Sequence, residues 1–247
     1  PVALMSVSGL LVALLPLVTT LTLPAVPDDL FVVVSVLLLG SVFIALIGLD
    51  AGSAFGGMGS SRHMMVSALV EPTVLVAIYA LSIPVGASTL STILAARMST
   101  PASIVSPVSA LALVALLIAV IAETGRLPVD NPSTHLELTM IHEAMVLEAS
   151  GRDLGWIELA SWIRLTGLFG LVANLALPWG IAEQATVGAL VIGVAAVIGK
   201  VIVLAGIVAA VEVFLAKVRL FRVPEIMAAS FVLGFLAVTA SYLTGAP

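Results

Sequence analysis

Two ionisable residues lie inside long apolar runs of the sequence, where a charged group is unfavourable. Glu71 stands about a turn and a half into the run that begins at Met64, and Lys200 stands near the middle of a later run. A charge in hydrocarbon costs about a few kcal/mol, so such a group normally faces a partner or a water-filled cavity. These positions predict residues that carry an ion through a membrane; a structural ion pair or a snorkelling lysine is the alternative.

Pro72 follows Glu71 directly, which frees a backbone carbonyl one turn earlier and favours a kink beside the acid. Arg164 and Glu212 stand nearer the ends of their apolar runs. Snorkelling to the membrane interface explains either position. Glu212 nevertheless stays among the candidates for an ion path.

A polar, acid-rich segment from Glu123 to Glu158 interrupts the apolar chain. As far as residue 148 its acids are Glu123, Asp130, Glu137, Glu143 and Glu148, accompanied by two histidines and Arg126. Carboxylates near a membrane interface can pass protons when burial adapts them to that task, whereas a solvated acidic loop has the same composition. The sequence leaves both interpretations open.

The spacing within this segment predicts a helix. Ser133 or Thr134 can cap a helix that runs to Ala149, because Pro128 and Pro132 end what precedes it. On such a helix Glu137 and Glu148 project from one side, within about 20° of each other. His142 and Glu143 point elsewhere, and Glu123 with Arg126 is expected to form a structural pair at the end of the preceding span.

The composition determines which elements must position these groups. Hydrophobic residues make up 61% of the chain and charged residues 9%, against about 25% charged in an ordinary soluble domain. We predict an all-α, polytopic bundle forming one integral membrane domain (1–247), with a polar loop and short helix at 123–153. About seven runs are long enough to cross the bilayer: Val2 to Leu23, Leu30 to Leu49, Met64 to Pro84, Ser103 to Ala122, Leu154 to Leu177, Val187 to Phe214 and Ile226 to Leu243.

Basic residues predict the orientation of this bundle, because they are retained on the cytoplasmic side. Six of the nine fall in the second, fourth and sixth gaps between runs: Arg62, Arg126, Arg152, Lys217, Arg219 and Arg222. The odd-numbered gaps contain only Arg97. We therefore expect a multi-pass protein of the cell (inner) membrane with the 123–153 loop facing the cytoplasm. Since Pro1 lies within a hydrophobic run, we also expect an N-terminal portion, up to an eighth helix, to precede it.

Several classes of site are excluded by what the sequence lacks. It contains no cysteine, which rules out thiolate-bound iron-sulfur clusters, cysteine-based zinc sites and disulfides. Its three histidines are too few and too scattered to argue for haem, and no basic face suggests nucleic acid. We expect no metal, redox centre or catalytic residue in this chain.

Three stretches resemble the complex I subunit 1 family, in its hydrogenase branch. The string Ala122-Glu-Thr-Gly-Arg-Leu-Pro-Val-Asp130 is similar to the family's loop motif, and the match continues to Glu148-Ala-Ser-Gly151. Upstream, Gly48-Leu-Asp-Ala-Gly-Ser-Ala-Phe-Gly-Gly-Met-Gly-Ser-Ser-Arg62 followed by Glu71-Pro72 resembles the membrane subunit of formate hydrogenlyase and hydrogenase-4 type complexes. Downstream, Lys200, Glu212 and the stretch 216–222 are also similar.

The resemblance implies a membrane foot on which hydrogenase-like large and small subunits dock from the cytoplasm, linked to antiporter-like subunits that move H⁺ or Na⁺. Nickel-iron and iron-sulfur centres would belong to the partners. The implied roles are an ion path with Glu71, Glu137, Glu143, Glu148, Lys200 and Glu212, and a docking loop with Arg62, Glu123, Arg126, Asp130 and Arg152.

The sequence departs from the complex I pattern where Ser133, Thr134 and His135 replace acids, which weakens an interpretation as a quinone site. The leading hypothesis is therefore a subunit of a group 4, energy-converting hydrogenase or formate hydrogenlyase-like complex. The alternatives are the quinone-site subunit of a complex I-like NADH/quinone oxidoreductase, a stand-alone ion carrier, and a passive membrane anchor.

Overall fold

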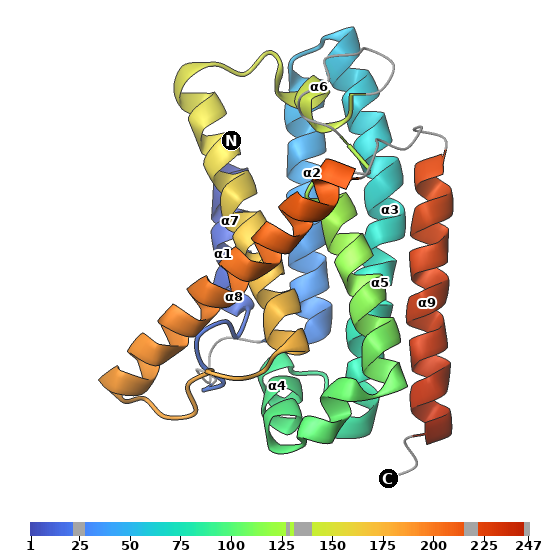
Figure 1. Ribbon diagram of the computed structural model, residues 1–247. Coiled ribbons are helices and arrows are strands. Elements are labelled where there is room, and N and C mark those ends of the chain that lie inside the picture. The colour runs from blue at the N-terminus through green and yellow to red at the C-terminus, as the bar shows by residue number, and fades with distance from the viewer. Residues whose placement is uncertain (22–27, 127–128, 131–139, 215–221, 245–247) are drawn as a thin grey trace.

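The computed structural model describes residues 1–21, 28–126, 129–130, 140–214 and 222–244, and nearly all of them are helical (Figure 1). The helices are α1 (Val2–Leu14), α2 (Leu30–Asp50), α3 (Ala54–Ser82), η1 (Ile83–Val85), α4 (Leu90–Ser99), η2 (Pro101–Val105), α5 (Pro107–Glu123), α6 (His142–Val146), α7 (Gly151–Ala176), α8 (Val187–Phe214) and α9 (Val223–Thr244). Within this part five helices are long and apolar enough to cross a membrane, and α1 and α5 are shorter apolar helices. The predicted helical membrane bundle is confirmed.

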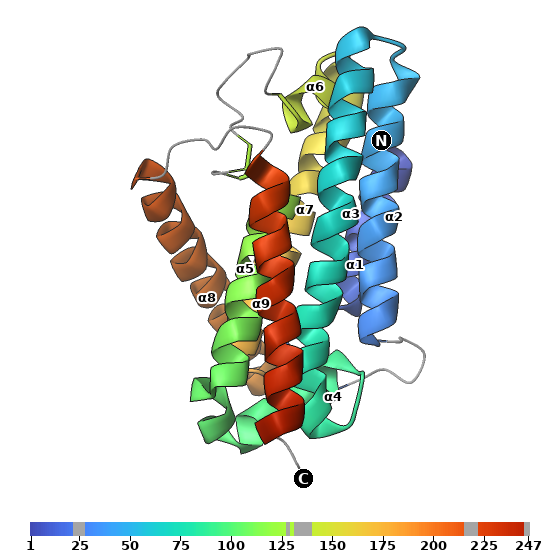
Figure 2. The same ribbon diagram turned by 90° about the vertical axis from the view of Figure 1, so that its right-hand side faces the viewer.

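Helix α3 forms the centre of the bundle. It packs against α2, α5 and α9 along its length and against the short α6 at one end. Helix α1 packs between α2 and α7, and α8 packs mainly against α7. Figures 1 and 2 show α6 at one end of the bundle and α4 at the other, with α8 leaning away from α9. We call these two ends the α6 end and the α4 end.

Several helix boundaries differ from the prediction because caps and small residues extend helices beyond their apolar runs. Helix α3 begins at Ala54, ten residues before the predicted start, where the Ser53 side chain accepts a hydrogen bond from the third residue of the helix. Helix α7 begins at Gly151, three residues before its apolar run, whereas α5 begins at Pro107, four residues after the predicted start. Helix α4 lies in a stretch for which the sequence predicted no helix.

The first predicted span is shorter than expected. Helix α1 ends at Leu14, and Leu15 is extended with ψ of 128°. The next residue is Pro16, whose ring disfavours the helical conformation in the residue before it. The predicted helix to Leu23 is therefore wrong beyond Leu14, and part of that stretch lies outside the described residues.

Glycines bring α2 and α3 into close contact. A Cβ atom on Gly56 would lie 2.1 Å from the carbonyl oxygen of Gly48, and one on Gly59 would lie 2.9 Å from a side chain of α6. The Ser60 hydroxyl donates to a backbone carbonyl of α2 at 2.8 Å. The glycine-rich stretch at the start of α3 therefore has a packing role, and it fixes where α6 rests on the bundle.

Buried polar groups hold the α4 end together. The Asp28 carboxylate accepts a hydrogen bond from the backbone N–H of Ser91, near the start of α4, at 2.8 Å. Arg97, only 4% exposed, donates to the carbonyl of Leu175 at the end of α7 and to the Ser109 hydroxyl, both at 2.9 Å. Burial lowers the pKa of Arg97. Arg97, the single basic residue of the odd-numbered gaps, is thus buried, and its hydrogen bonds join α4 to α5 and α7.

Candidate functional site

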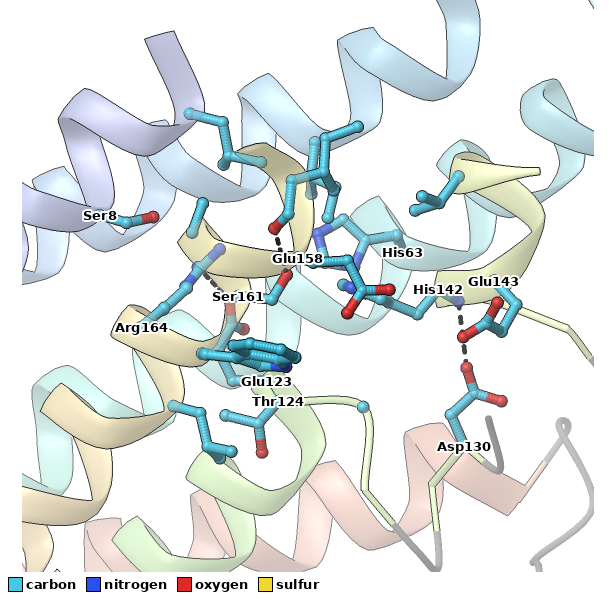
Figure 3. Close-up of a pocket in the computed structure, with 18 of the residues that line it drawn as sticks. Ser8, His63, Glu123, Thr124, Asp130, His142, Glu143, Glu158, Ser161 and Arg164 are labelled. Atoms are coloured by element: carbon cyan, nitrogen blue, oxygen red, sulfur yellow. Dashed lines mark hydrogen bonds and ion pairs between the residues drawn. The ribbon is translucent and has the colours of Figure 1, made fainter. Parts of the chain in front are cut away.

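A cavity of about 440 Å³ opens at the α6 end, between α1, α5, α6 and α7. Its walls combine apolar side chains from α1 and α7 with polar ones from five helices and the loop after α5 (Figure 3). Polar side chains that line it are Ser8, His63, Glu123, Thr124, Arg126, Asp130, His142, Glu143, Glu158, Ser161 and Arg164. We call this space the charged pocket. It collects most of the ionisable residues of the described polar segment.

An ion pair between Glu123 and Arg164 lies at the inner end of the charged pocket. It joins the last residue of α5 to the middle of α7, and the two side chains are 1% and 10% exposed. The Arg164 guanidinium also donates to the Leu37 carbonyl at 2.9 Å and to the Ser41 hydroxyl at 2.7 Å. The Ser41 hydroxyl in turn donates to Glu123 at 2.9 Å. Three helices are therefore joined through one buried charge pair.

Gly125 ends α5 so that the following loop turns into the pocket. Its φ of 63° is left-handed, a conformation that favours glycine at a helix C-terminus. The Arg126 carbonyl then accepts from the backbone N–H groups of Val129 and Asp130, at 3.0 and 3.2 Å. The Asp130 carboxylate accepts from the N–H of His142, the first residue of α6, at 3.0 Å. Asp130 thus caps α6 and attaches it to the end of α5.

Two histidines from distant parts of the chain meet in the charged pocket. The rings of His63 on α3 and His142 on α6 are edge to face, with centroids 6.4 Å apart. Burial lowers the pKa of His142 below its usual value of 6.5, although the Asp130 carboxylate acts in the opposite direction. His142 is therefore neutral at pH 7.

Glu71 is buried inside the bundle, with 6% of its surface exposed. It lies on α3 two turns beyond His63, next to Ser41 and within electrostatic reach of Glu123 and Arg164. Its Oε1 atom has no hydrogen-bond partner among the described groups. Glu71 is thus brought together with the Glu123–Arg164 pair, as a second carboxylate deeper in the bundle.

Lys200 has a separate environment closer to the α4 end. Its ammonium donates to the Asn174 side-chain oxygen at 2.9 Å. Asn174 is fully buried, and its amide donates to the carbonyl of Leu17 at 2.8 Å. Asn174 lies ten residues beyond Arg164 on α7, about 15 Å along the helix. Polar groups therefore occur at successive depths of α7.

The remaining candidates occupy the α6 end. The Arg62 guanidinium donates to the Met140 carbonyl at 2.8 Å, and Arg126 and Glu143 line the charged pocket. Arg152 is exposed at the start of α7. Glu212 is half-buried near the end of α8 and lines neither of the two large pockets at the α6 end. Glu137, Lys217 and Arg219 lie outside the described residues.

The predicted helix that would align Glu137 with Glu148 is not continuous. Met140 and Ile141 are not helical, and α6 covers only His142–Val146. The Asp130 carboxylate caps α6, and the predicted cap at Ser133 or Thr134 lies outside the described residues. Glu148 is exposed and lines a second pocket, of about 400 Å³, with Asp50 and Asp153. The predicted continuous helix to Ala149 is therefore wrong, whereas the position of Glu137 lies outside the described residues.

Sequence reasoning missed three residues of the site. It interpreted Arg164 as an interfacial residue, but α7 begins at Gly151, so Arg164 is the fourteenth residue of the helix and too deep to snorkel. It paired Glu123 with Arg126, whereas the structure pairs it with Arg164. It gave His63 and Ser41 no role. The helical spacing of His63 from Glu71, two turns on one face, was the signal that could have found His63.

The charged pocket leads to buried carboxylates that interact with one another, Glu123 at its inner end and Glu71 deeper in the bundle. Ionisable groups at such depth normally face a partner or a water-filled cavity. No group of three or more histidines, aspartates and glutamates that could hold a metal occurs in the described part of the chain.

Comparison with known proteins identifies relatives of this chain. The family model described as NADH dehydrogenase matches residues 1–242. Formate hydrogenlyase subunit 4 of Escherichia coli is 30% identical over 237 residues, which cover 96% of this chain and 76% of that protein. Hydrogenase-4 component C of E. coli is 29% identical over 240 residues, covering 96% of this chain and 74% of that protein.

Proposed function

Because the chain belongs to the NADH dehydrogenase family, whose members are of the complex I subunit 1 type, we propose that it is the membrane-embedded subunit of a group 4 nickel-iron hydrogenase or formate hydrogenlyase-like complex. Its relatives are a subunit of a formate hydrogenlyase and a component of hydrogenase-4. In this role residues 1–247 act as one membrane domain that docks the redox subunits and couples their electron transfer to movement of H⁺ or Na⁺.

The main support for a coupling role is that charged residues in contact with one another extend from the pocket into the bundle. The charged pocket opens at the α6 end, and Glu123, Arg164 and Glu71 continue inward from it through shared contacts with Ser41. A passive anchor gains nothing from a buried acid with an unsatisfied oxygen, because such a group is unfavourable unless it has a partner or a function. The arrangement favours coupling over anchoring.

In the proposed orientation the α6 end faces the cytoplasm in the inner membrane. The described basic residues of the even-numbered gaps, Arg62, Arg126, Arg152 and Arg222, support this orientation, since positive residues are retained inside. Hydrogenase-like large and small subunits, which would carry the nickel-iron and iron-sulfur centres, then dock over the charged pocket. Arg62 and Asp130, which bind the backbone of Met140 and His142 at the start of α6, form part of this docking surface.

The coupling step is electrostatic. A change of charge or shape in the docked subunits alters the environment of the Glu123–Arg164 pair, and Glu71 responds because it interacts with both residues. Antiporter-like partner subunits receive this change deeper in the membrane, where Lys200 and Asn174 provide further polar groups. Interactions of this kind act over several ångströms in a low-dielectric interior.

Replacement of Glu71 by Gln tests this role. Gln keeps the size of the side chain but cannot change charge, so we expect hydrogen evolution and assembly to persist while ion movement into proteoliposomes falls by about tenfold or more. Exposed Glu183, in the stretch between α7 and α8, provides the matched control, and its change to Gln should leave both activities unchanged. Ion movement at the wild-type level in the Glu71 variant would rule out a coupling role for this acid.

A further inference from the structure

Three polar side chains form a column along one face of α3. His63, Ser67 and Glu71 are spaced by four residues, so successive members lie about 40° apart on one face of the helix, with Cβ atoms about 5–6 Å apart. All three are buried, with exposed fractions of 6%, 1% and 6%. The column runs from the charged pocket, which His63 lines, to the acid inside the bundle.

Each member of the column has an unsatisfied polar atom. Nε2 of His63, Oγ of Ser67 and Oε1 of Glu71 have no hydrogen-bond partner among the groups that the structure describes. A buried polar atom without a partner is costly, and internal water usually satisfies it. Neighbouring members of the column are close enough along the helix for one water molecule to bridge their side chains, since two hydrogen bonds of about 2.8 Å each span about the same distance as their Cβ atoms. The column therefore has the spacing of a hydrogen-bonded chain of side chains and water.

The polar and charged groups around the column come from four other helices. Ser41 of α2 lies beside Glu71, Glu123 of α5 and Arg164 of α7 act on both ends, and His142 of α6 faces His63. Glu123 Oε2 and Arg164 Nε also lack partners among the described groups. The unsatisfied atoms are thus concentrated where the pocket meets the column.

We infer that the ion entering through this site is a proton and that His63 transfers it from the charged pocket toward Glu71 through water held at Ser67. This inference rests on the proposed coupling function and assigns the ion and the relay residue that the function leaves open. An imidazole can accept a proton on one ring nitrogen and release it from the other, which makes histidine a common proton shuttle.

The same column is poorly suited to Na⁺. A hard cation is bound by several oxygen ligands at once, from carboxylates, carbonyls and water. Along this face of α3 the column offers one carboxylate and one hydroxyl, and its outer member is an imidazole. A proton needs only a continuous series of hydrogen bonds, so the column discriminates between the two ions by its donor and acceptor types.

The test uses the whole complex reconstituted in proteoliposomes, with hydrogen evolution, lumenal pH and uptake of radioactive sodium measured together. The wild-type complex should move protons in Na⁺-free buffer at an undiminished rate. The change His63→Gln keeps a hydrogen-bonding side chain of similar size but removes proton exchange. We expect it to lower protons moved per hydrogen evolved by about tenfold or more, with assembly and electron transfer preserved.

Ser67→Ala should lower the same ratio by a smaller factor, because neighbouring water can partly replace the hydroxyl. The matched control is Ser230→Ala, which removes an equally buried serine hydroxyl on α9, bonded to the Ala115 carbonyl and outside the column. Its ratio should equal that of the wild type. Imidazole added to the complex with His63→Ala should restore part of the lost proton movement, which a purely structural role of His63 does not predict.

Each negative result contradicts a different claim. Sodium uptake by the wild type that is required for coupling overturns the inference and leaves the proposed function intact. A wild-type proton ratio in His63→Gln overturns the relay role. Hydrogen evolution by the wild type with no movement of either ion contradicts the proposed function itself.

Discussion

Removal of the Glu123 carboxylate should destabilise the bundle more than removal of any exposed charge. In Glu123→Ala the Arg164 guanidinium keeps its bonds to the Leu37 carbonyl and the Ser41 hydroxyl but loses its counter-charge. It cannot lose its proton, and 10% of its side chain is exposed, so little water can reach it. Breaking one partner of a buried pair typically costs about 3–5 kcal/mol, and we expect a loss in this range.

The complementary change should be less harmful. In Arg164→Met the remaining Glu123 carboxyl group can take up a proton and become neutral, an option that the guanidinium lacks. Combining Glu123→Ala with Arg164→Met removes both charges and should recover about 2–4 kcal/mol relative to the sum of the single changes.

The assay is denaturant-induced unfolding of the protein in mild detergent, followed by tryptophan fluorescence at neutral pH. Arg152→Met is the matched control, because Arg152 is exposed on the same helix as Arg164. It should change the free energy of unfolding by no more than about 0.5 kcal/mol. Strictly additive effects of the two single changes would refute the reasoning, since they would show that the two side chains do not stabilise each other.

Three further predictions concern packing, polar burial and pH. Gly56→Ala should destabilise the bundle by about 1–3 kcal/mol, because the added Cβ would lie 2.1 Å from a carbonyl oxygen of α2. The added Cβ in Gly57→Ala meets nothing within 4 Å, so this control should be neutral or stabilising. Unfolding in detergent compares the two variants. Asn174→Leu should cost about 1–3 kcal/mol by leaving the Lys200 ammonium without its acceptor, and Lys200→Met in the same background should recover most of it in thermal unfolding. Burial lowers the pKa of His142, so the unfolded state binds more protons than the native state below the usual pKa of 6.5, and the free energy of unfolding should fall as pH drops through that region. His142→Gln should reduce this slope in a pH series of unfolding curves, and an unchanged slope would contradict the assignment.

The sequence predicted what depends on local composition. Long apolar runs identified the spans. The unfavourable positions of Glu71 and Lys200 identified two residues that have polar neighbours in the structure: Glu71 is buried, and Lys200 is half-buried and donates to Asn174. The turn at Gly125 also follows from local rules, because glycine favours the left-handed conformation found there.

What the sequence did not reveal depends on contacts between distant helices. Arg164 and Glu123 are 41 residues apart, and nothing in the local pattern of either helix pairs them. Asp130 caps α6 across twelve residues, a contact that no short-range rule identifies. Helix α4 was missed because its packing beneath the bundle, through Arg97, stabilises a stretch of mixed polarity.

The most direct test of the central claim is isolation of the complex from native membranes in mild detergent through this chain, with mass spectrometry of its partners and an assay of hydrogen evolution. The account predicts hydrogenase-like large and small subunits, antiporter-like membrane subunits and hydrogen evolution in the same particle. Co-purification with flavin-containing, quinone-dependent dehydrogenase subunits, or purification of the chain alone, would contradict it.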